Sequence, residues 1–257
     1  MMPNILQYPI ALFGALRAGL VVVKVNPLYT ARELEHQLND SGAKTMVIFE
    51  NSCHTLQEVI DNTPVKHVLT TQIGDFLQFP KSMVVNFAIK HIKKMVPGWQ
   101  LPNARSFKEV VFRADESKFK APTLGHEDTA FLQYTGGTTG VAKGAELTHK
   151  NIVSNMLQAR AWIGDFVTSE ENPIIITPLP LYHIFSLTAN CFIFSYVGAL
   201  NVLIPNPRDI DGFVKELKKW KFTAFTGVNT LFNALVDHQK FPECDFSHLK
   251  VALGGRM

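Results

Sequence analysis

Residues 129–144 read TAFLQYTGGTTGVAKG, an apolar run that leads into a loop of glycines and threonines and then a lysine. Glycines let a backbone turn tightly and bring its N–H groups close to an anion. Threonine hydroxyls add hydrogen-bond donors and candidate magnesium ligands, and the ammonium of Lys143 adds a point charge. The composition of this loop therefore predicts a binding site for a polyphosphate.

Two common phosphate-binding loops do not fit this stretch. A Walker A loop requires Gly, four residues and then Gly-Lys-Ser/Thr, whereas Lys143 lies between Ala142 and Gly144. The dinucleotide fingerprint Gly-x-Gly-x-x-Gly is absent as well. An ordinary loop between two strands is the plain alternative, and the full string with its lysine is more specific than such a loop.

Strand-like and helix-like patterns alternate on both sides of the loop. The expected strands are 20–25, 44–49, 66–70, 129–133, 145–148, 174–177, 200–204, 222–226 and 249–253. The expected helices are 5–18, 31–41, 55–61, 82–96, 150–162, 185–197, 210–220 and 230–237. Thr30 and Glu33 form a capping box at the start of one helix, and Gly42 is a C-cap signal at its end. This alternation favours an α/β fold with mostly parallel sheets covered by helices.

The chain is expected to divide into three segments. These are a first βα unit over 1–71, an irregular insertion or connector over 72–126, and a βα unit carrying the glycine loop over 127–257. The amphipathic helix expected at 82–96 has three lysines and a histidine in its C-terminal half. It could dock on an anionic membrane surface, or it could be a surface helix packed on the sheet, which is commoner and is preferred. Residues 97–126 are expected to be a poorly ordered connector.

Composition limits the classes of function. A net charge of +3 is too small to favour nucleic acid as a partner. Cys53, Cys191 and Cys244 lack metal-ligand spacing, which predicts free thiols in a reducing cytoplasm. The charge-free run 172–207 is interrupted by prolines, so a buried strand, helix and strand is favoured over a membrane span. We therefore expect a cytoplasmic protein, with peripheral membrane contact and a homodimer left open.

The two ends predict a fragment. Helix-like sequence begins almost at Met1, and the chain stops at Gly254-Gly255-Arg256-Met257, directly after a strand-like run. Ligands of α/β sheets bind at the carboxyl ends of the strands, so the sequence stops where a site should continue.

The loop resembles the nucleotide-binding signature of the adenylate-forming superfamily: Tyr-Thr-Ser/Gly-Gly-Thr-Thr-Gly, two residues, then Lys-Gly. Acyl-CoA synthetases, luciferases and peptide-synthetase adenylation domains belong to this superfamily. Four further stretches resemble the bacterial long-chain fatty acid–CoA ligases within it. They are NPLYT at 26–30, PLYHIF at 180–185, NPRD at 206–209 and GVNTLFNAL at 227–235. The resemblance implies part of the large N-terminal domain, with the C-terminal domain outside this chain.

The resemblance also implies a two-step reaction. A long-chain fatty carboxylate attacks the α-phosphate of ATP, which gives an acyl-adenylate and pyrophosphate, and the thiol of coenzyme A then displaces AMP. Mg²⁺ and the loop would neutralise charge on the departing pyrophosphate. We expect the chain alone to make no acyl-CoA, because motifs of both domains lie outside it.

Individual residues receive roles from the same resemblance. The candidate catalytic residues are Lys143, His183 and Thr135, and Thr135 is also the candidate Mg²⁺ ligand. The candidate nucleotide-binding residues are Tyr134, Thr135, Gly136, Gly137, Thr138, Thr139, Gly140, Lys143, Gly254 and Gly255. The candidate substrate-binding residues are His183, Val228 and Phe232. The plain alternatives are a chance buried histidine, ordinary core residues at 228 and 232, and simple turn residues at 138 and 139. Arg256 replaces a usually small residue, which leaves the adenine contact open.

Two other functions are kept as alternatives. One is a fatty acyl-AMP ligase that passes the acyl group to a carrier protein. The other is a non-catalytic module that binds fatty acid or membrane through the helix at 82–96. The glycine loop counts against this last function.

Overall fold

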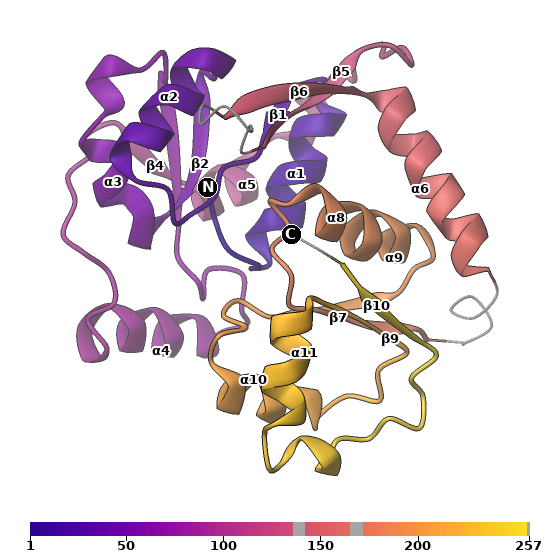
Figure 1. The fold of residues 1–257 in the computed structure, drawn as a ribbon. Coiled ribbons are helices and arrows are strands. Elements are labelled where there is room, and N and C mark those ends of the chain that lie inside the picture. Colours follow the sequence, from indigo (N-terminus) through magenta and orange to yellow (C-terminus); the bar gives the residue numbers. More distant parts are fainter. Residues whose placement is uncertain (136–141, 165–171, 256–257) are drawn as a thin grey trace. The chain divides into compact units, whose positions relative to one another are not determined.

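The computed structural model describes residues 1–135, 142–164 and 172–255 (Figure 1). The chain forms two compact units: residues 6–148 together with Met1–Met2, and residues 149–257 together with Pro3–Ile5. The glycines and threonines at 136–140, and Arg256, lie outside the described residues.

The first unit contains a parallel three-stranded sheet in the order β2-β3-β4. Its strands are β2 (Thr45–Phe49), β3 (His67–Thr71) and β4 (Ala104–Ser106). Helix α2 (Ala31–Ser41) packs Leu34 and Leu38 into one core with Met46, Ile48 and Leu56. The helical segments that follow in this part of the chain are η1 (Glu50–Ser52), α3 (Cys53–Gln57), η2 (Ile60–Asn62), α5 (Phe107–Arg113) and η4 (Glu116–Lys118).

A second sheet of the first unit carries the two ends of the glycine loop. Strand β5 (Thr129–Thr135) lies between β1 (Val22–Val23), which is parallel to it, and β6 (Lys143–Thr148), which is antiparallel. Helix α1 (Gln7–Arg17) precedes β1. The expected strand at 20–25 is shorter than predicted, because Leu20 and Val21 are exposed and do not pair.

The second unit is a parallel sheet in the order β10-β9-β7-β8. Its strands are β7 (Ile174–Thr177), β8 (Leu200–Leu203), β9 (Ala224–Gly227) and β10 (Val251–Gly254). Its helical segments are α6 (His149–Ile163), α8 (Ile184–Ser186), η5 (Leu187–Phe192), α9 (Ile193–Tyr196), α10 (Ile210–Leu217), α11 (Asn229–Val236) and η6 (Phe241–Glu243).

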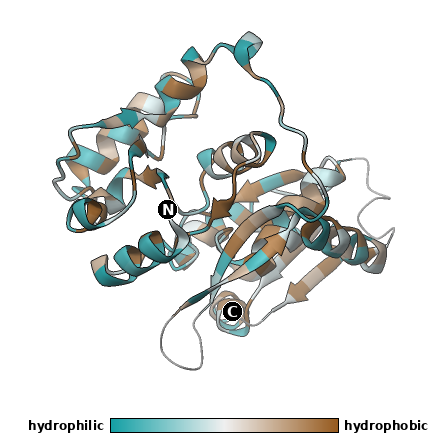
Figure 2. Cartoon of the chain, turned by 90° about the horizontal axis from the view of Figure 1, so that it is seen from above, coloured by the Kyte–Doolittle hydropathy of each residue, from teal (hydrophilic) through white to brown (hydrophobic). Residues whose placement is uncertain are grey.

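Helices cover both faces of this sheet. Neighbouring strand residues point to opposite faces. Accordingly, Ile175 packs with Phe194 of α9, whereas Ile176 packs with Phe213 of α10 and Leu235 of α11. Figure 2 shows the hydrophobic colour concentrated on the strands, while the helices carry both colours. The α/β prediction is therefore confirmed, and the charge-free run at 172–207 forms β7, the buried α8–η5–α9 segment and β8.

The expectation of a poorly ordered connector at 97–126 is wrong. This stretch contains β4, α5 and η4. The Ser106 hydroxyl accepts a hydrogen bond from the Glu109 N–H at 3.3 Å, which caps α5. The sequence carries the cap signal Ser106-x-x-Glu109, the same pattern as Thr30-x-x-Glu33 at the start of α2.

The helix expected at 82–96 is present but ends earlier, and its expected apolar stripe is only partly covered. Helix α4 (Lys81–Phe87) continues as the π-helix η3 (Ala88–Ile92). Ser82 is the one buried residue between 81 and 92, and Val84 and Ile92 of the expected apolar stripe are 63% and 70% exposed. No helix in the described part of the chain is both long enough and apolar enough to cross a bilayer. Cys53, Cys191 and Cys244 are free and buried, as expected for thiols.

Candidate functional site

The β5–β6 hairpin brings together the two described residues that flank the glycine loop. Thr135 ends β5, Lys143 begins β6, and the two are paired in the antiparallel register. Directly opposed residues place their side chains within about 5.5 Å at Cβ. Both residues are exposed. A hydroxyl and an ammonium therefore stand side by side at the base of the loop.

The Tyr134 side chain points away from that exposed pair. It is 7% exposed, and its hydroxyl donates a hydrogen bond to the Asp40 carboxylate at 2.5 Å. Burial, followed by the nearby Asp40 carboxylate, raises the pKa of the Tyr134 phenol. The phenol therefore stays a neutral donor and fixes β5 to α2.

The other predicted residues lie at one edge of the sheet in the second unit. His183 follows β7, Val228 follows β9, and Gly254 and Gly255 end and follow β10. The carboxyl ends of parallel strands share an edge, and ligands of α/β sheets bind there. These candidate residues therefore all end or follow strands at the same edge of one sheet.

His183 is half-buried and caps the short helix α8. Its Nδ1 accepts a hydrogen bond from the Phe185 N–H at 3.4 Å. Nδ1 is therefore the unprotonated nitrogen in this arrangement, and Nε2 carries the proton of the neutral ring.

Buried polar side chains that were not singled out in the sequence hold the segment before His183. The Asn4 amide donates to the carbonyls of Thr177 and Leu179 at 3.0 and 2.8 Å. Its oxygen accepts from the Leu181 N–H at 2.9 Å. Ser186 donates to the same Leu179 carbonyl at 2.7 Å. These contacts fix the backbone between β7 and α8.

Asn190, on the π-helix η5, joins two strands of the same sheet. Its amide donates to the Thr177 hydroxyl at 3.1 Å and to the Ile176 carbonyl at 3.3 Å. Its oxygen accepts from the Thr226 hydroxyl at 3.0 Å, and Thr177 donates onward to Asn201 at 3.0 Å. Asn190 is fully buried, so each of these bonds replaces a bond to water. An asparagine inside an apolar run was the available sequence signal.

Two glycines at this edge make room for aromatic rings. A Cβ on Gly227 would lie 2.7 Å from the Phe232 ring, and a Cβ on Gly255 would lie 2.8 Å from the Phe185 ring. The Gly255 N–H also donates to the Gly227 carbonyl at 3.0 Å. Phe232 further packs edge-on against Phe225 at 5.3 Å between ring centroids. Phe232 therefore covers the ends of β9 and β10.

We predict opposite effects for the same substitution at two glycines. Gly227→Ala should destabilise the protein by about 1–3 kcal/mol, because the Phe232 ring must move. Gly14→Ala should stabilise it by about 0.5–1 kcal/mol, because Gly14 is helical and a Cβ there meets no atom within 4 Å. Thermal unfolding of both variants tests this prediction. Equal shifts of the two midpoints would contradict it.

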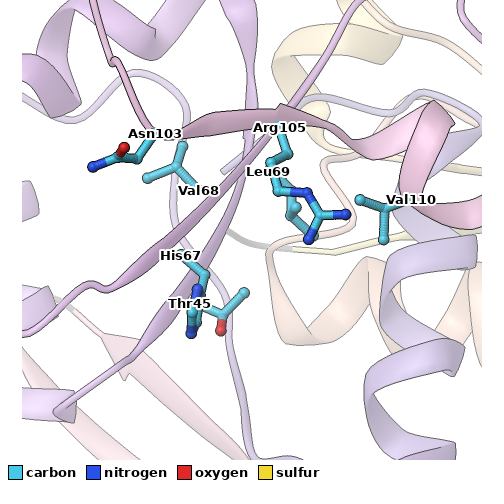
Figure 3. A pocket seen from close by; sticks show the side chains of 7 residues that line it. All are labelled: Thr45, His67, Val68, Leu69, Asn103, Arg105 and Val110. Atoms are coloured by element: carbon cyan, nitrogen blue, oxygen red, sulfur yellow. The ribbon is translucent and has the colours of Figure 1, made fainter.

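A shallow cavity of about 220 Å³ lies elsewhere, in the first unit (Figure 3). Thr45 and His67, the first residues of β2 and β3, line it together with Asn103 and Arg105. None of the predicted site residues contributes to it.

In the described part of the chain, the candidate ligand for Mg²⁺ is a hydroxyl oxygen, that of Thr135. The described residues contain no cluster of three or more His, Cys, Asp or Glu side chains that could hold a metal. Mg²⁺ keeps several waters and takes few protein ligands, with substrate phosphates supplying others. The exposed Thr135 hydroxyl at the base of the loop suits that coordination.

Comparisons with known proteins match this fold over its whole length. The family model for the AMP-binding enzymes matches residues 1–257. The chain is 56% identical to long-chain-fatty-acid–CoA ligases of Escherichia coli O6:H1 and of Haemophilus influenzae; it is covered completely and spans 46% of each relative. The crystal structure of an anthranilate CoA ligase with anthranoyl-AMP aligns at a TM-score of 0.79 and 20% identity, covering 99% of this chain and 44% of that one. A long-chain-fatty-acid–CoA ligase from Archaeoglobus fulgidus aligns at 0.71 and 25% identity, covering 100% and 44%. Together with the hairpin that carries the glycine loop, these matches show that the chain belongs to the AMP-binding enzyme family.

Proposed function

We propose that the protein containing this chain is an AMP-forming long-chain fatty acid–CoA ligase. The observation that carries the proposal is the 56% identity over the complete chain to ligases with that name. The paired Thr135 and Lys143 support it, because activation of a carboxylate by ATP needs positive charge and hydrogen-bond donors at the departing pyrophosphate. The chain spans less than half of those relatives, so coenzyme A binding rests on the family alone.

Each candidate residue receives a role within this proposal. Lys143 would neutralise charge on the pyrophosphate, and Thr135 would hold Mg²⁺, which supplies further charge neutralisation when bound. His183 would lie beside the acyl carboxylate. Val228 and Phe232 would line the acyl site, and Gly254 and Gly255 would pass the adenine. We further propose that the segments 1–71, 72–126 and 127–257 are parts of one N-terminal adenylation domain.

Pyrophosphate exchange tests the proposed function. The full-length protein is incubated with ATP, Mg²⁺, labelled pyrophosphate and a series of fatty acids of increasing length. Exchange that depends on a long-chain acid is expected, since each buried CH₂ contributes about 0.8 kcal/mol. Absence of acid-dependent exchange would refute the proposal. If exchange occurs but no thioester forms with coenzyme A, a carrier protein is the acceptor instead.

We also propose that α4 and η3 contact an anionic membrane surface. Phe79, Met83, Phe87, Ile92 and Met95 are between 53% and 79% exposed. No Asp or Glu occurs between residues 76 and 108, whereas four lysines lie between 81 and 94. Exposed apolar side chains mixed with cations suit a bilayer with anionic headgroups.

Vesicle binding checks this surface. Met83→Ser with Phe87→Ser in the full-length protein should weaken binding to phosphatidylglycerol-containing vesicles by about tenfold or more. Leu157→Ser on α6, also at an exposed apolar residue, is the matched control and should bind normally. Equal binding by all variants would exclude the surface. Loss of a dimer on size-exclusion chromatography, without a change in vesicle binding, would assign the surface to a second copy.

A further inference from the structure

Helix α2 presents two polar side chains to the hairpin that carries the glycine loop. The helix is fixed in place at both ends and along its inner face. Thr30 and Glu33 form its capping box, Gly42 ends it with φ 64°, and Leu34 and Leu38 are buried. His36 and Asp40 lie four residues apart, so they share one face of the helix.

Those two side chains contact opposite flanks of the loop. Asp40 accepts the hydrogen bond from the Tyr134 hydroxyl, at the residue before Thr135. His36 Nε2 lies 3.1 Å from the carbonyl oxygen of Ala142, at the residue before Lys143. Because a carbonyl only accepts, His36 is the donor. One rigid helix thus holds the strand that enters the loop and the strand that leaves it.

Gly144 completes this arrangement from β6. It is paired with Tyr134 across the hairpin, and a Cβ there would lie 3.0 Å from the Tyr134 ring. Any larger residue after Lys143 would therefore require the Tyr134 ring to shift by a few tenths of an ångström. The close approach of the Tyr134 ring therefore explains why a glycine follows Lys143 in this fold.

The location of Asp40 indicates a role other than stabilising its own helix. It lies in the last turn of α2, where the helix dipole disfavours a negative charge, and that turn has no basic residue. Its carboxylate instead accepts the hydrogen bond from the Tyr134 hydroxyl. Neither residue of the pair His36 and Asp40 was singled out in the sequence, because their partners lie about a hundred residues away.

We propose that His36 and Asp40 are positioning residues for nucleotide binding. They keep Tyr134 and Ala142 in place against α2, so that Thr135 and Lys143 remain opposed at the base of the loop. The inference rests on the proposed function, and it predicts a defect in ATP use without a defect in fatty acid use.

The test compares truncating and conservative variants of the full-length protein. Asp40→Ala and His36→Leu should each raise the KM for ATP in pyrophosphate exchange by about tenfold, with the KM for fatty acid unchanged. Asp40→Asn keeps an acceptor and His36→Gln keeps a donor, so both should restore most of the affinity. Asn39→Ala, an exposed neighbour on the same turn, is the matched control and should behave as wild type. Asp40→Ala and Tyr134→Phe should not be additive, because they remove the same bond.

Hydrogen–deuterium exchange supplies a readout that does not depend on catalysis. Asp40→Ala should speed exchange of the Thr135 and Lys143 amides while leaving β2 and β3 protected. Unchanged exchange at the hairpin, or an equal rise in KM for both substrates, would overturn the positioning role. If the wild-type protein shows no acid-dependent pyrophosphate exchange, the proposed function fails. Hydrogen–deuterium exchange of the Thr135 and Lys143 amides still tests whether His36 and Asp40 hold the hairpin in place.

Discussion

Lys143→Ala is expected to lower acid-dependent pyrophosphate exchange by about 10²–10³-fold, the usual cost of removing one preorganised donor from a developing anion. Lys143 is exposed at the start of β6, so its side chain makes no core contact that the substitution would remove. The substitution should therefore lower the rate of exchange with ATP without unfolding the protein. The midpoint of thermal unfolding should move by less than about 2 °C.

Two further variants define what that result means. Lys66→Ala removes another exposed lysine of the first unit, away from the hairpin, and should leave exchange unchanged. Lys143→Arg keeps the charge but replaces a compact ammonium by a planar fork, so it should recover only part of the rate. Equal activity of Lys143→Ala and Lys66→Ala would show that the cation beside the loop does not act on the pyrophosphate.

The sequence predicts those parts of the fold whose causes are local. The capping box at Thr30 and Glu33 and the C-cap at Gly42 give α2 its observed bounds. The β-branched run at 174–177 gives β7 its observed bounds, because a strand buried on both faces reads as a continuous apolar run. Strand β4 and helix α5, within 97–126, are not predicted although Ser106 and Glu109 form a cap signal, because β4 is only three residues long and pairs with β3, more than 30 residues earlier in the chain.

Prediction of the site has the same limit as prediction of the fold, because it succeeds only where the cause is local in sequence. Thr135 and Lys143 are predicted from their motif, and the β5–β6 hairpin pairs them because only seven residues, 136–142, lie between them in the chain. His36, Asp40, Asn4 and Asn190 were not identified. Their partners lie far away in sequence, so a one-dimensional pattern shows them as ordinary polar residues. A motif therefore predicts candidate binding residues, whereas the side chains that hold those residues in place are found only from contacts in the folded chain.

Asn190→Leu is expected to destabilise the protein by about 3 kcal/mol, or roughly 10 °C in the midpoint of a domain of this size. Leucine has a similar size but offers no acceptor to the buried Thr226 hydroxyl and no donor to the Ile176 carbonyl. Burial leaves neither group access to water, so the whole cost of desolvation is felt. Thermal unfolding of the full-length protein measures the effect.

The partner residue separates loss of hydrogen bonds from poor packing. Adding Thr226→Val to Asn190→Leu removes the orphaned hydroxyl, so the double variant should be more stable than the sum of the single effects predicts. Asn233→Leu, the same substitution at an exposed residue of α11, should change stability by less than about 0.5 kcal/mol. If the two effects simply add, the destabilisation by Asn190→Leu comes from poor packing of the leucine side chain and not from the lost hydrogen bonds. Recovery would instead show that a buried polar network joins η5 to β7 and β9, the two strands whose carboxyl ends lead into His183 and Val228.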